Sequence, residues 1–318
     1  MITKAKIGII GGSGFYEFLN GEEIDISTPF GKPSDKILLA DPFDPAQGSP
    51  FDPPAVSRIE PTQGRTIAFL PRHGKKHQIP PHKINYRANI YALKKLGVKT
   101  IISSTAVGSL KSYIKPGDFV LTDQFINAAF CRFDTFFDTG GNNVASQAGG
   151  SANPNEPLDK KFANAENAWQ LLFNKVAHIS MAEPYCPSLR QIAKNACQKL
   201  KFDCHAKGTA IIIQGPRFST TAESLFWSQF ADTINMTQYP EVALAKELEM
   251  CYLNISLVTD YDAGLKNQPN IAPVSAQEIS QVFKQNNEKL KQLILEIIAS
   301  LPNERTCSCH ESLKTAFL

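Results

Sequence analysis

Short runs of apolar residues alternate along the chain with longer stretches in which apolar positions recur every three or four residues. The short runs predict buried strands, and the periodic stretches predict helices. We expect strands at 7–10, 66–70, 100–103, 118–122, 208–213 and 255–258, and helices at 85–96, 188–200, 221–230, 239–248 and 275–301. This alternation favours an α/β fold, a single layered domain with a central mixed β-sheet flanked by helices.

Two segments interrupt this pattern. Residues 41–64 contain six prolines and little periodicity, and residues 140–168 begin with a stretch rich in Gly, Asn, Ala and Ser. Both are typical of surface insertions rather than of linkers between domains. We therefore expect one domain over residues 1–302, followed by a C-terminal tail at 303–318.

Composition narrows the function classes. Of the 318 residues, 42% are hydrophobic and 20% are charged, and the net charge is +3. That charge is too small to indicate nucleic acid or an anionic membrane as a partner. No run approaches the ~18 apolar residues of a membrane span, and the first residues lead directly into a strand rather than a signal peptide. We expect a cytoplasmic protein.

The seven cysteines are dispersed along the chain, which favours reduced thiols in such a protein. Cys307 and Cys309, next to His310, could indicate a metal or redox site. However, only one residue separates them, and the sequence shows no second pair that would complete a tetrahedral site. We therefore predict no metal, and we expect these two cysteines to be free thiols or a strained disulfide outside the chemistry.

Two aspartates follow the last predicted strand, in the pentapeptide Val258 to Asp262. Alternation along a strand directs Asp260 and Asp262 to the same side, with Tyr261 opposite. Ligands of α/β folds bind at such strand ends. Paired carboxylates can share a proton there, or accept hydrogen bonds from an amino group while donating a proton to a ring nitrogen. A solvated acidic turn is the alternative interpretation.

A glycine-rich turn follows the first strand. Gly11, Gly12, Ser13 and Gly14 could offer backbone amides and a hydroxyl to an anion, or could form a tight turn without a ligand. A dinucleotide fingerprint needs a third glycine where Glu17 stands, and a phosphate loop needs a Gly-Lys-Ser/Thr that is absent. The turn therefore argues against a nicotinamide-dependent oxidoreductase.

Other strand ends carry further anion-binding groups. Arg72 offers a bidentate fork and His73 another donor, while hydroxyls occur at 104–109 and at Thr237. This combination fits inorganic phosphate or a phosphoester better than a carboxylate. On the loop at 214–219, Phe218 could stack on a planar base or cover the core. Arg217 could contact an anion or form a structural salt bridge.

These motifs resemble those of the S-methyl-5'-thioadenosine phosphorylases, within the trimeric purine nucleoside phosphorylase group. The resemblance covers residues from about 6 to 300, in the order found in that family. It rests on IIGGSG (9–14), RHG (72–74), NYRAN (85–89), STAVGSL (104–110), PGD (116–118), DQF (123–125), MAEP (181–184), GPRFS (215–219), NMT (235–237), PE (240–241) and TDYD (259–262).

The resemblance implies a nucleoside phosphorylase-like fold, a homotrimer and a role for each motif. Phosphate, a co-substrate rather than a cofactor, would contact Ser13, Arg72, His73, Thr105, Ala106 and Thr237. Met236 would lie under the ribose, Phe218 and Ser219 beside the base, and His178 would reach a neighbouring subunit's 5'-pocket. Asp260 and Asp262 would be the catalytic residues at the purine edge.

The implied activity is that of a pentosyltransferase of purine and methionine salvage. It splits S-methyl-5'-thioadenosine reversibly with phosphate, giving adenine and 5-methylthioribose 1-phosphate. A 6-oxopurine phosphorylase is the first alternative, although an amide would suit that base better than a carboxylate. The second is a nucleoside-binding protein without turnover, against which the phosphate-binding groups argue.

Overall fold

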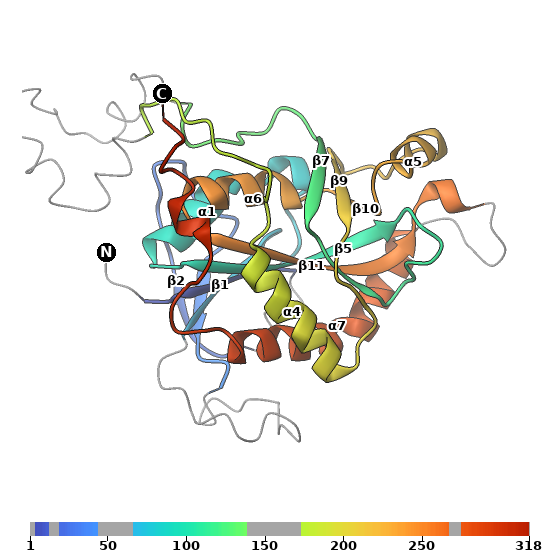
Figure 1. Cartoon of the computed structure of the whole chain (residues 1–318), viewed down its shortest axis with the longest axis horizontal. Coiled ribbons are helices and arrows are strands. Elements are labelled where there is room, and N and C mark those ends of the chain that lie inside the picture. The colour runs from blue at the N-terminus through green and yellow to red at the C-terminus, as the bar shows by residue number, and fades with distance from the viewer. Residues whose placement is uncertain (1–3, 13–18, 44–65, 139–172, 267–274, 318) are drawn as a thin grey trace, which may run out of the picture.

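A mixed β-sheet runs through the centre of the molecule between two layers of helices (Figure 1). The computed structural model describes residues 4–12, 19–43, 66–138, 173–266 and 275–317. Within these residues the sheet has 11 strands. They are β1 (Ile7–Gly11), β2 (Glu22–Ile24), β3 (Ile37–Ala40), β4 (Ile67–Pro71), β5 (Thr100–Ser109), β6 (Phe119–Leu121), β7 (Gln124–Ala128), β8 (Cys204–His205), β9 (Thr209–Ile213), β10 (Thr233–Asn235) and β11 (Cys251–Tyr261).

The long strand β5 joins the two halves of this sheet. The strand order is β2-β3-β4-β1-β5-β10-β9-β7, and a branch through β11, β6 and β8 also starts at β5. Strands β1, β4, β5 and β11 are parallel, so their carboxyl ends lie at the same edge. The β5–β11 register shifts between Val258 and Asp260. Because the carboxyl ends of these parallel strands share one edge, the motifs that follow the strands lie close together.

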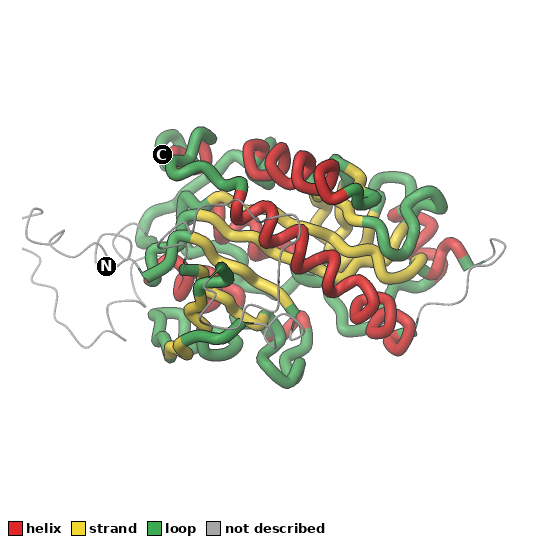
Figure 2. The backbone as a smooth tube through the Cα atoms, turned by 90° about the horizontal axis from the view of Figure 1, so that it is seen from below, coloured by secondary structure: helices red, strands yellow, loops and turns green. Residues whose placement is uncertain are grey.

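The helices form one layer on each side of the sheet. Helices α1 (Tyr86–Lys95) and α6 (Gln238–Glu247) pack together on one face, and α4 (Pro187–Leu200) and α7 (Ala276–Ala299) pack together on the other. Figure 2 shows the strands behind the helices of the second layer. The short helix α5 (Thr221–Trp227) lies apart from both layers (Figure 1). None of the described helices combines the length and the apolar character needed to cross a bilayer.

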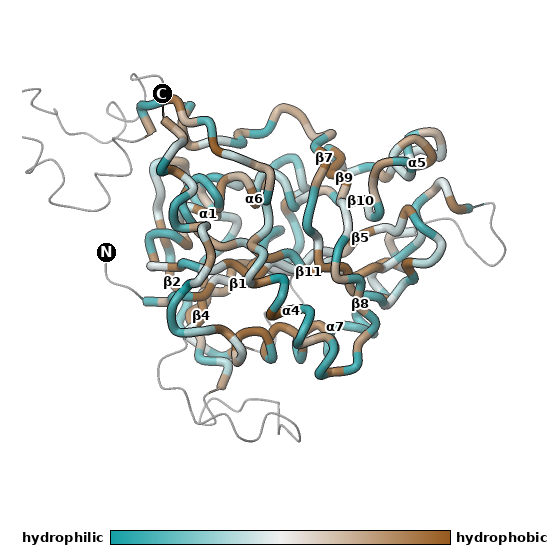
Figure 3. Tube along the Cα trace, in the orientation of Figure 1, coloured by the Kyte–Doolittle hydropathy of each residue, from teal (hydrophilic) through white to brown (hydrophobic). Residues whose placement is uncertain are grey.

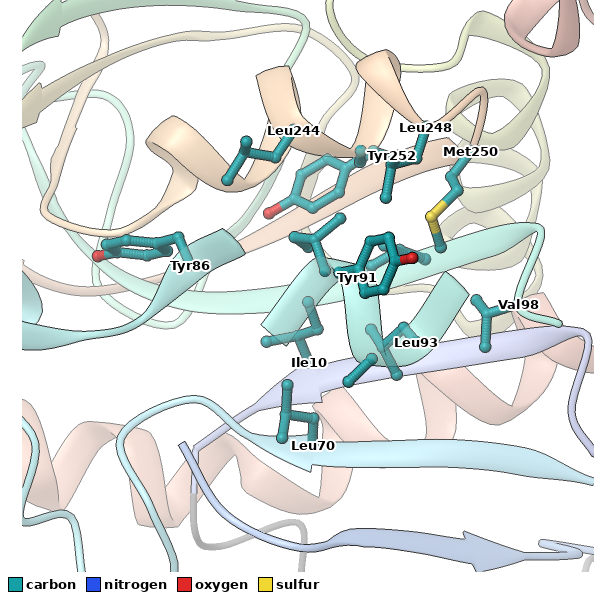
Figure 4. Close-up of a cluster of buried hydrophobic side chains, with 14 of the residues drawn as sticks. Ile10, Leu70, Tyr86, Tyr91, Leu93, Val98, Leu244, Leu248, Met250 and Tyr252 are labelled. Carbon is teal, nitrogen blue, oxygen red and sulfur yellow. The ribbon is translucent and has the colours of Figure 1, made fainter. Parts of the chain in front are cut away.

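Each helix layer encloses a hydrophobic core against the sheet. In the first core, Tyr91 and Leu93 of α1 lie close to Leu244 of α6 and Tyr252 of β11 (Figure 4). The second core is formed by apolar residues of α4 and α7 with the opposite face of the central strands. Hydrophobic residues are accordingly concentrated along these strands in Figure 3. This two-sided burial explains why the strands appear as continuous apolar runs in the sequence.

The predicted elements are all present, with boundaries that differ at some ends. Strand β5 continues to Ser109 and β11 begins at Cys251, because both are buried beyond the apolar runs that predicted them. Strands β2, β3, β7, β8 and β10 were not predicted, since each is short or carries exposed polar residues. The predicted insertion at 140–168 lies outside the described residues, as do residues 44–64 of the other insertion.

The C-terminal tail packs against both cores. After α7 it crosses from one helix layer to the other (Figure 1), passing through the short helix η5 (Ser308–Glu311). Leu313 and Ala316 are buried in the first core, and the Ala316 carbonyl accepts a hydrogen bond from the backbone N–H of His178 at 2.8 Å. The tail is therefore part of the folded domain.

The expectation that Cys307 and Cys309 lack a second pair of thiols was wrong. The folded tail brings them to Cys186, at the start of α4, and Cys251, at the start of β11. These two residues are 65 positions apart in the sequence, and only the packing of α4 beside β11 brings them together.

Candidate active site

A cavity of about 1060 Å³ opens at the carboxyl ends of the central strands. Ten of the residues singled out in the sequence line it: Arg72, His73, Thr105, Ala106, Phe218, Ser219, Met236, Thr237, Asp260 and Asp262. Ser13 lies outside the described residues, although its neighbour Gly12 lines the cavity. His178 is described and exposed, but it is not part of the cavity wall.

Arg72 lies at the base of the cavity, in a buried ion pair. Its Nε donates to Glu241 Oε1 at 2.5 Å, and its Nη2 donates to Glu241 Oε2 at 3.1 Å and to Ser103 Oγ at 2.6 Å. Nη1 donates to the Ser104 carbonyl at 2.9 Å. Burial acts to lower the pKa of Arg72, but the charge of Glu241 and the hydrogen bond to it raise it overall. The guanidinium thus stays charged and fixed, and Nη1 has a second hydrogen that can reach a ligand.

His73 is held as a neutral ring. Its Nδ1 lies 2.8 Å from the Ile79 carbonyl, which can only accept a hydrogen bond, so Nδ1 carries the proton. Burial and the charge of Arg72 lower the pKa of His73 to about 4. The ring of His77 stacks on it, with centroids 4.5 Å apart. In this state Nε2 is an acceptor, which differs from the donor role expected from the sequence.

The two threonines of the predicted phosphate site have different surroundings. The Thr105 hydroxyl is buried and donates to Asn254 Oδ1 at 3.2 Å, within a network that includes Ser256. Thr237 is the N-cap of α6 and makes no side-chain cap hydrogen bond there, while its backbone N–H donates to Asn235 Oδ1 at 2.7 Å. The Thr237 hydroxyl is therefore available to a ligand, whereas that of Thr105 is used within the protein.

The two carboxylates line the same side of the cavity, as alternation predicted. The hydroxyl of Tyr261, between them in the sequence, is directed to the Ser112 carbonyl instead. Asp260 Oδ1 accepts from Thr259 Oγ1 at 2.7 Å, and Asp262 Oδ2 accepts from Ser219 Oγ at 2.5 Å. Asp262 is buried and Asp260 is partly exposed. The pair thus presents one fixed and one more accessible carboxylate to a ligand.

Gly108 of β5 allows β10 and the carboxylate end of β11 to pack closely against it. A Cβ on Gly108 would lie 2.9 Å from an Ile234 methyl and 3.1 Å from Asp260 Oδ2. Any larger residue at this position of β5 would displace Asp260 or β10.

The loop at 214–219 forms a part of the cavity wall that contacts Asp262 through Ser219. Phe218 is 38% exposed and lines the cavity, so it is a candidate for stacking on a base. Arg217 forms an exposed ion pair with Glu223, with Nη2 and Oε1 2.7 Å apart, and it is not part of the wall. Of the two alternatives for Arg217, the structure therefore shows the salt bridge and not an anion contact in the cavity.

Several residues of the site were missed in the sequence. Glu241 belongs to the PE motif at 240–241, but its pairing with Arg72 spans 169 positions, which the motif does not indicate. Arg132 donates to the carbonyls of Met236, Tyr239 and Gln214 at 2.9, 2.6 and 2.9 Å, and it thereby joins two loops of the cavity. Lone arginines and glutamates carry no local signal of such long-range contacts.

Helix α7 supplies the remaining wall, which was also missed. Its first turns place Ile279, Ser280, Phe283, Lys284, Asn287 and Glu288 along the cavity. The sequence predicted this helix from its apolar period, but the period does not show which turn faces a ligand. The cavity therefore has a polar floor at the strand ends and a partly apolar wall at α7.

Comparisons with known proteins agree with this geometry. Residues 6–299 match the family model of the phosphorylase superfamily. An S-methyl-5'-thioadenosine phosphorylase from Thermofilum pendens is 45% identical over 321 aligned positions, which cover 100% of both chains. The chain belongs to the S-methyl-5'-thioadenosine phosphorylase family.

Solved structures of this family have the same fold. A methylthioadenosine phosphorylase from an antarctic soil metagenomic library aligns with a TM-score of 0.77 and 36% identity, covering 99% of this chain and 93% of the other. A mutant of the adenosine/methylthioadenosine phosphorylase from Schistosoma mansoni, in complex with methylthioadenosine, aligns with a TM-score of 0.73 and 31% identity, covering 98% and 96%. The predicted family and fold class are thus confirmed.

Proposed function

We propose that the cavity catalyses the reversible phosphorolysis of S-methyl-5'-thioadenosine to adenine and 5-methylthioribose 1-phosphate. The observation that carries this proposal is the meeting of an arginine-based anion site with two carboxylates in one cavity. Membership of the family supports the same reaction. Phosphate is the nucleophile, so the reaction requires no catalytic serine, cysteine, cofactor or metal.

The phosphate would lie between Arg72, His73, the backbone at Thr105 and Ala106, and the Thr237 hydroxyl. Arg72 is suited to this role because Glu241 fixes its plane while one Nη1 hydrogen stays available. An anion at this place stabilises the positive charge that develops at C1' of the ribosyl group as its bond to N9 breaks. A new C1'–O bond to phosphate then forms.

The purine would bind between Phe218 and the two carboxylates, with Met236 under the ribose. Asp260 would donate a proton to N7, so that the leaving adenine is neutral, and would become a carboxylate. Asp262 would accept hydrogen bonds from the adenine amino group. Its bond to Ser219 supports this role, because it fixes the carboxylate in one orientation. Asp260, which is more accessible, is better placed to lose and regain a proton.

We also propose that the protein is a homotrimer in which His178 completes the 5'-pocket of a neighbouring subunit. His178 is exposed and lies away from the cavity of its own chain. Large apolar side chains are exposed in two nearby segments. After the end of β7, Phe130 and Phe133 are 66% and 70% exposed, and Val176, two residues before His178, is 63% exposed. If these side chains form one apolar patch, it would be a candidate surface for binding a second copy of the chain, and cyclic symmetry would bury it.

The reaction is tested by measuring adenine release from S-methyl-5'-thioadenosine with and without phosphate. Adenosine, inosine and methylthioinosine serve as competing substrates in the same assay. We expect release that depends strictly on phosphate and 6-aminopurine substrates that exceed 6-oxopurine ones. Adenine release that is equal without phosphate would overturn phosphorolysis, and binding without any release would favour a nucleoside-binding protein.

A further inference from the structure

Four cysteines from three distant parts of the chain meet at the amino end of β11. Cys186 is the N-cap of α4, Cys251 is the first residue of β11, and Cys307 and Cys309 lie at the start of η5. Their Sγ atoms all lie within 4.8 Å of one another, with Cys251 and Cys307 at 3.2 Å. Cys186 and Cys251 are buried, the other two are partly buried, and all four are free cysteines.

The arrangement of the four sulfurs matches a tetrahedral metal site. With Zn–S bonds of about 2.3 Å, the sulfurs of a zinc tetrathiolate lie roughly 3.8 Å apart. The observed separations allow this geometry with small side-chain rotations. Four thiolates are the ligand set that zinc takes in closed structural sites. We propose that Cys186, Cys251, Cys307 and Cys309 bind one zinc ion as a structural site.

The surroundings offset the charge that this site would carry. Four thiolates and one zinc ion leave a net charge of −2. Cys186 lies at the amino end of the 14-residue helix α4, where the helix dipole stabilises negative charge. Lys246 interacts electrostatically with Cys309 and Cys186, and its Nζ donates to the Glu183 carbonyl at 2.5 Å. The cation is therefore held beside the cluster.

The zinc would act on the fold rather than on the reaction. Asp260 follows Cys251 by nine residues along β11, so the cluster lies roughly 30 Å from the carboxylates at about 3.3 Å per residue. With four protein ligands, no position is left for a substrate. The ion would instead attach the C-terminal tail to α4 and β11. The inference therefore does not depend on the reaction proposed for the cavity.

The first experiment measures metal in the full-length protein, purified without a polyhistidine tag. Elemental analysis should find about one zinc ion per chain. The double variant Cys307→Ser/Cys309→Ser should lose this zinc, while Cys131→Ser, at an exposed cysteine outside the cluster, should retain it. Cobalt exchanged into the wild-type protein should give thiolate-to-metal charge-transfer bands and the visible absorption of tetrahedral Co²⁺. Zinc that remains bound in the double variant would overturn the assignment.

The second experiment separates zinc from disulfides and uses the wild-type protein alone, so it holds even if the double variant does not fold. The protein is denatured with a chelator but without a reductant, and its reactive thiols are counted. All seven cysteines should react, and zinc should be released in proportion. Fewer reactive thiols without zinc would mean disulfides, and seven thiols without zinc would mean a cluster of free cysteines. Either result would overturn the proposal.

The functional consequence is tested on the same samples. Chelation of the native protein should lower the Tm by several degrees, and added zinc should restore it. At a temperature where both forms are folded, kcat/KM for S-methyl-5'-thioadenosine should change less than twofold. A loss of activity without a change in Tm would contradict a structural role.

Discussion

At the scale of single residues, the buried pair of Arg72 and Glu241 links the proposed phosphate site to the stability of the fold. Both side chains are almost completely buried, so Arg72→Ala would remove a phosphate contact and leave a carboxylate unpaired. Breaking such a pair costs about 3–5 kcal/mol of folding free energy, and losing a charge-assisted anion contact costs about 2–4 kcal/mol in transition-state terms. We expect both a raised phosphate KM and a lowered Tm, measured by kinetics and thermal unfolding.

The exposed pair of Arg217 and Glu223 provides the matched control. Arg217→Ala removes the same chemical group from a solvent-exposed ion pair, and pairs of this kind contribute little to stability. Its phosphate KM and Tm should stay close to those of the wild-type protein. A phosphate KM that is unchanged in Arg72→Ala would remove this residue from the phosphate site.

The neutral ring of His73 limits the pH dependence of phosphate binding. Because Nδ1 donates to the Ile79 carbonyl, Nε2 is an acceptor and can meet phosphate only through a P–OH group of the anion. Both the monoanion and the dianion of phosphate carry such a group, so this contact can form on either side of the second pKa of phosphate. The phosphate KM, measured across that pKa, should therefore show no rise of about tenfold per pH unit from this contact. A rise of that size would mean that Nε2 faces a phosphate oxygen without a proton.

The same ring predicts a separate effect on stability. The pKa of His73 falls from 6.5 to about 4 on folding, first because of burial. The unfolded chain then binds the proton more readily, so stability present above pH 6.5 is lost as the pH falls towards 4. The variant His73→Gln should weaken this dependence in urea unfolding measured across that range. An equal loss in both proteins would assign the effect to other groups.

Asp260 predicts the base preference. Asp260→Asn cannot deliver a proton to N7, so kcat for S-methyl-5'-thioadenosine should fall by about 10²–10⁴-fold. The effect on inosine should be smaller, because an amide beside N7 can also donate to the adjacent 6-oxo group and so offset part of the loss. Product formation from both substrates checks this. Comparable kcat/KM for methylthioadenosine and methylthioinosine in the wild-type protein would contradict the adenine assignment.

At the scale of elements, the sequence predicted what depends on local pattern. Apolar runs predicted the central strands because two helix layers bury both faces of the sheet, and the 3.6-residue period predicted α1 and α7. Strand β7, with its exposed polar residues, carried no such signal. The strand-end motifs also predicted which residues would line the cavity. Their roles stay predictions.

Contacts between distant elements could not be predicted in this way. The Arg72–Glu241 pair and the four-cysteine cluster depend on which strands and helices become neighbours. The hydrogen of His73 is likewise fixed by a carbonyl six residues away whose direction only the folded loop determines. The type of a residue therefore indicated that its side chain could bind a ligand. Which of its hydrogen-bond donors stay available, and which are used within the protein, could be seen only in the structure.

Helix α7 predicts how the 5'-substituent is recognised. Ile279 and Phe283 give the cavity an apolar surface, which would favour a methylthio group over a hydroxyl. Replacing both by Ala should raise KM for S-methyl-5'-thioadenosine more than for adenosine, since a small apolar group contributes about 1–3 kcal/mol of discrimination. Steady-state kinetics with both nucleosides test this. Equal changes in both would mean that α7 does not contact the 5'-group.

At the scale of the whole molecule, the separation of His178 from its own cavity predicts a shared active site. The backbone N–H of His178 donates to the Ala316 carbonyl of the C-terminal tail. This hydrogen bond fixes the position on the surface from which the exposed His178 side chain extends. In an oligomer with shared sites, His178→Ala and Asp260→Asn would impair different halves of each site. Wild-type sites would therefore form again in mixed oligomers that contain both variants.

Subunit mixing tests this arrangement directly. The two variants are denatured together, refolded and compared with each variant refolded alone. The mixture should regain a substantial fraction of the wild-type kcat/KM, while a chain that carries both substitutions, mixed with itself, should not. Sedimentation of the same samples should give the mass of a trimer. If all residues of the site came from one chain, every site in the mixture would retain one defect, and no activity above the average of the two variants would appear.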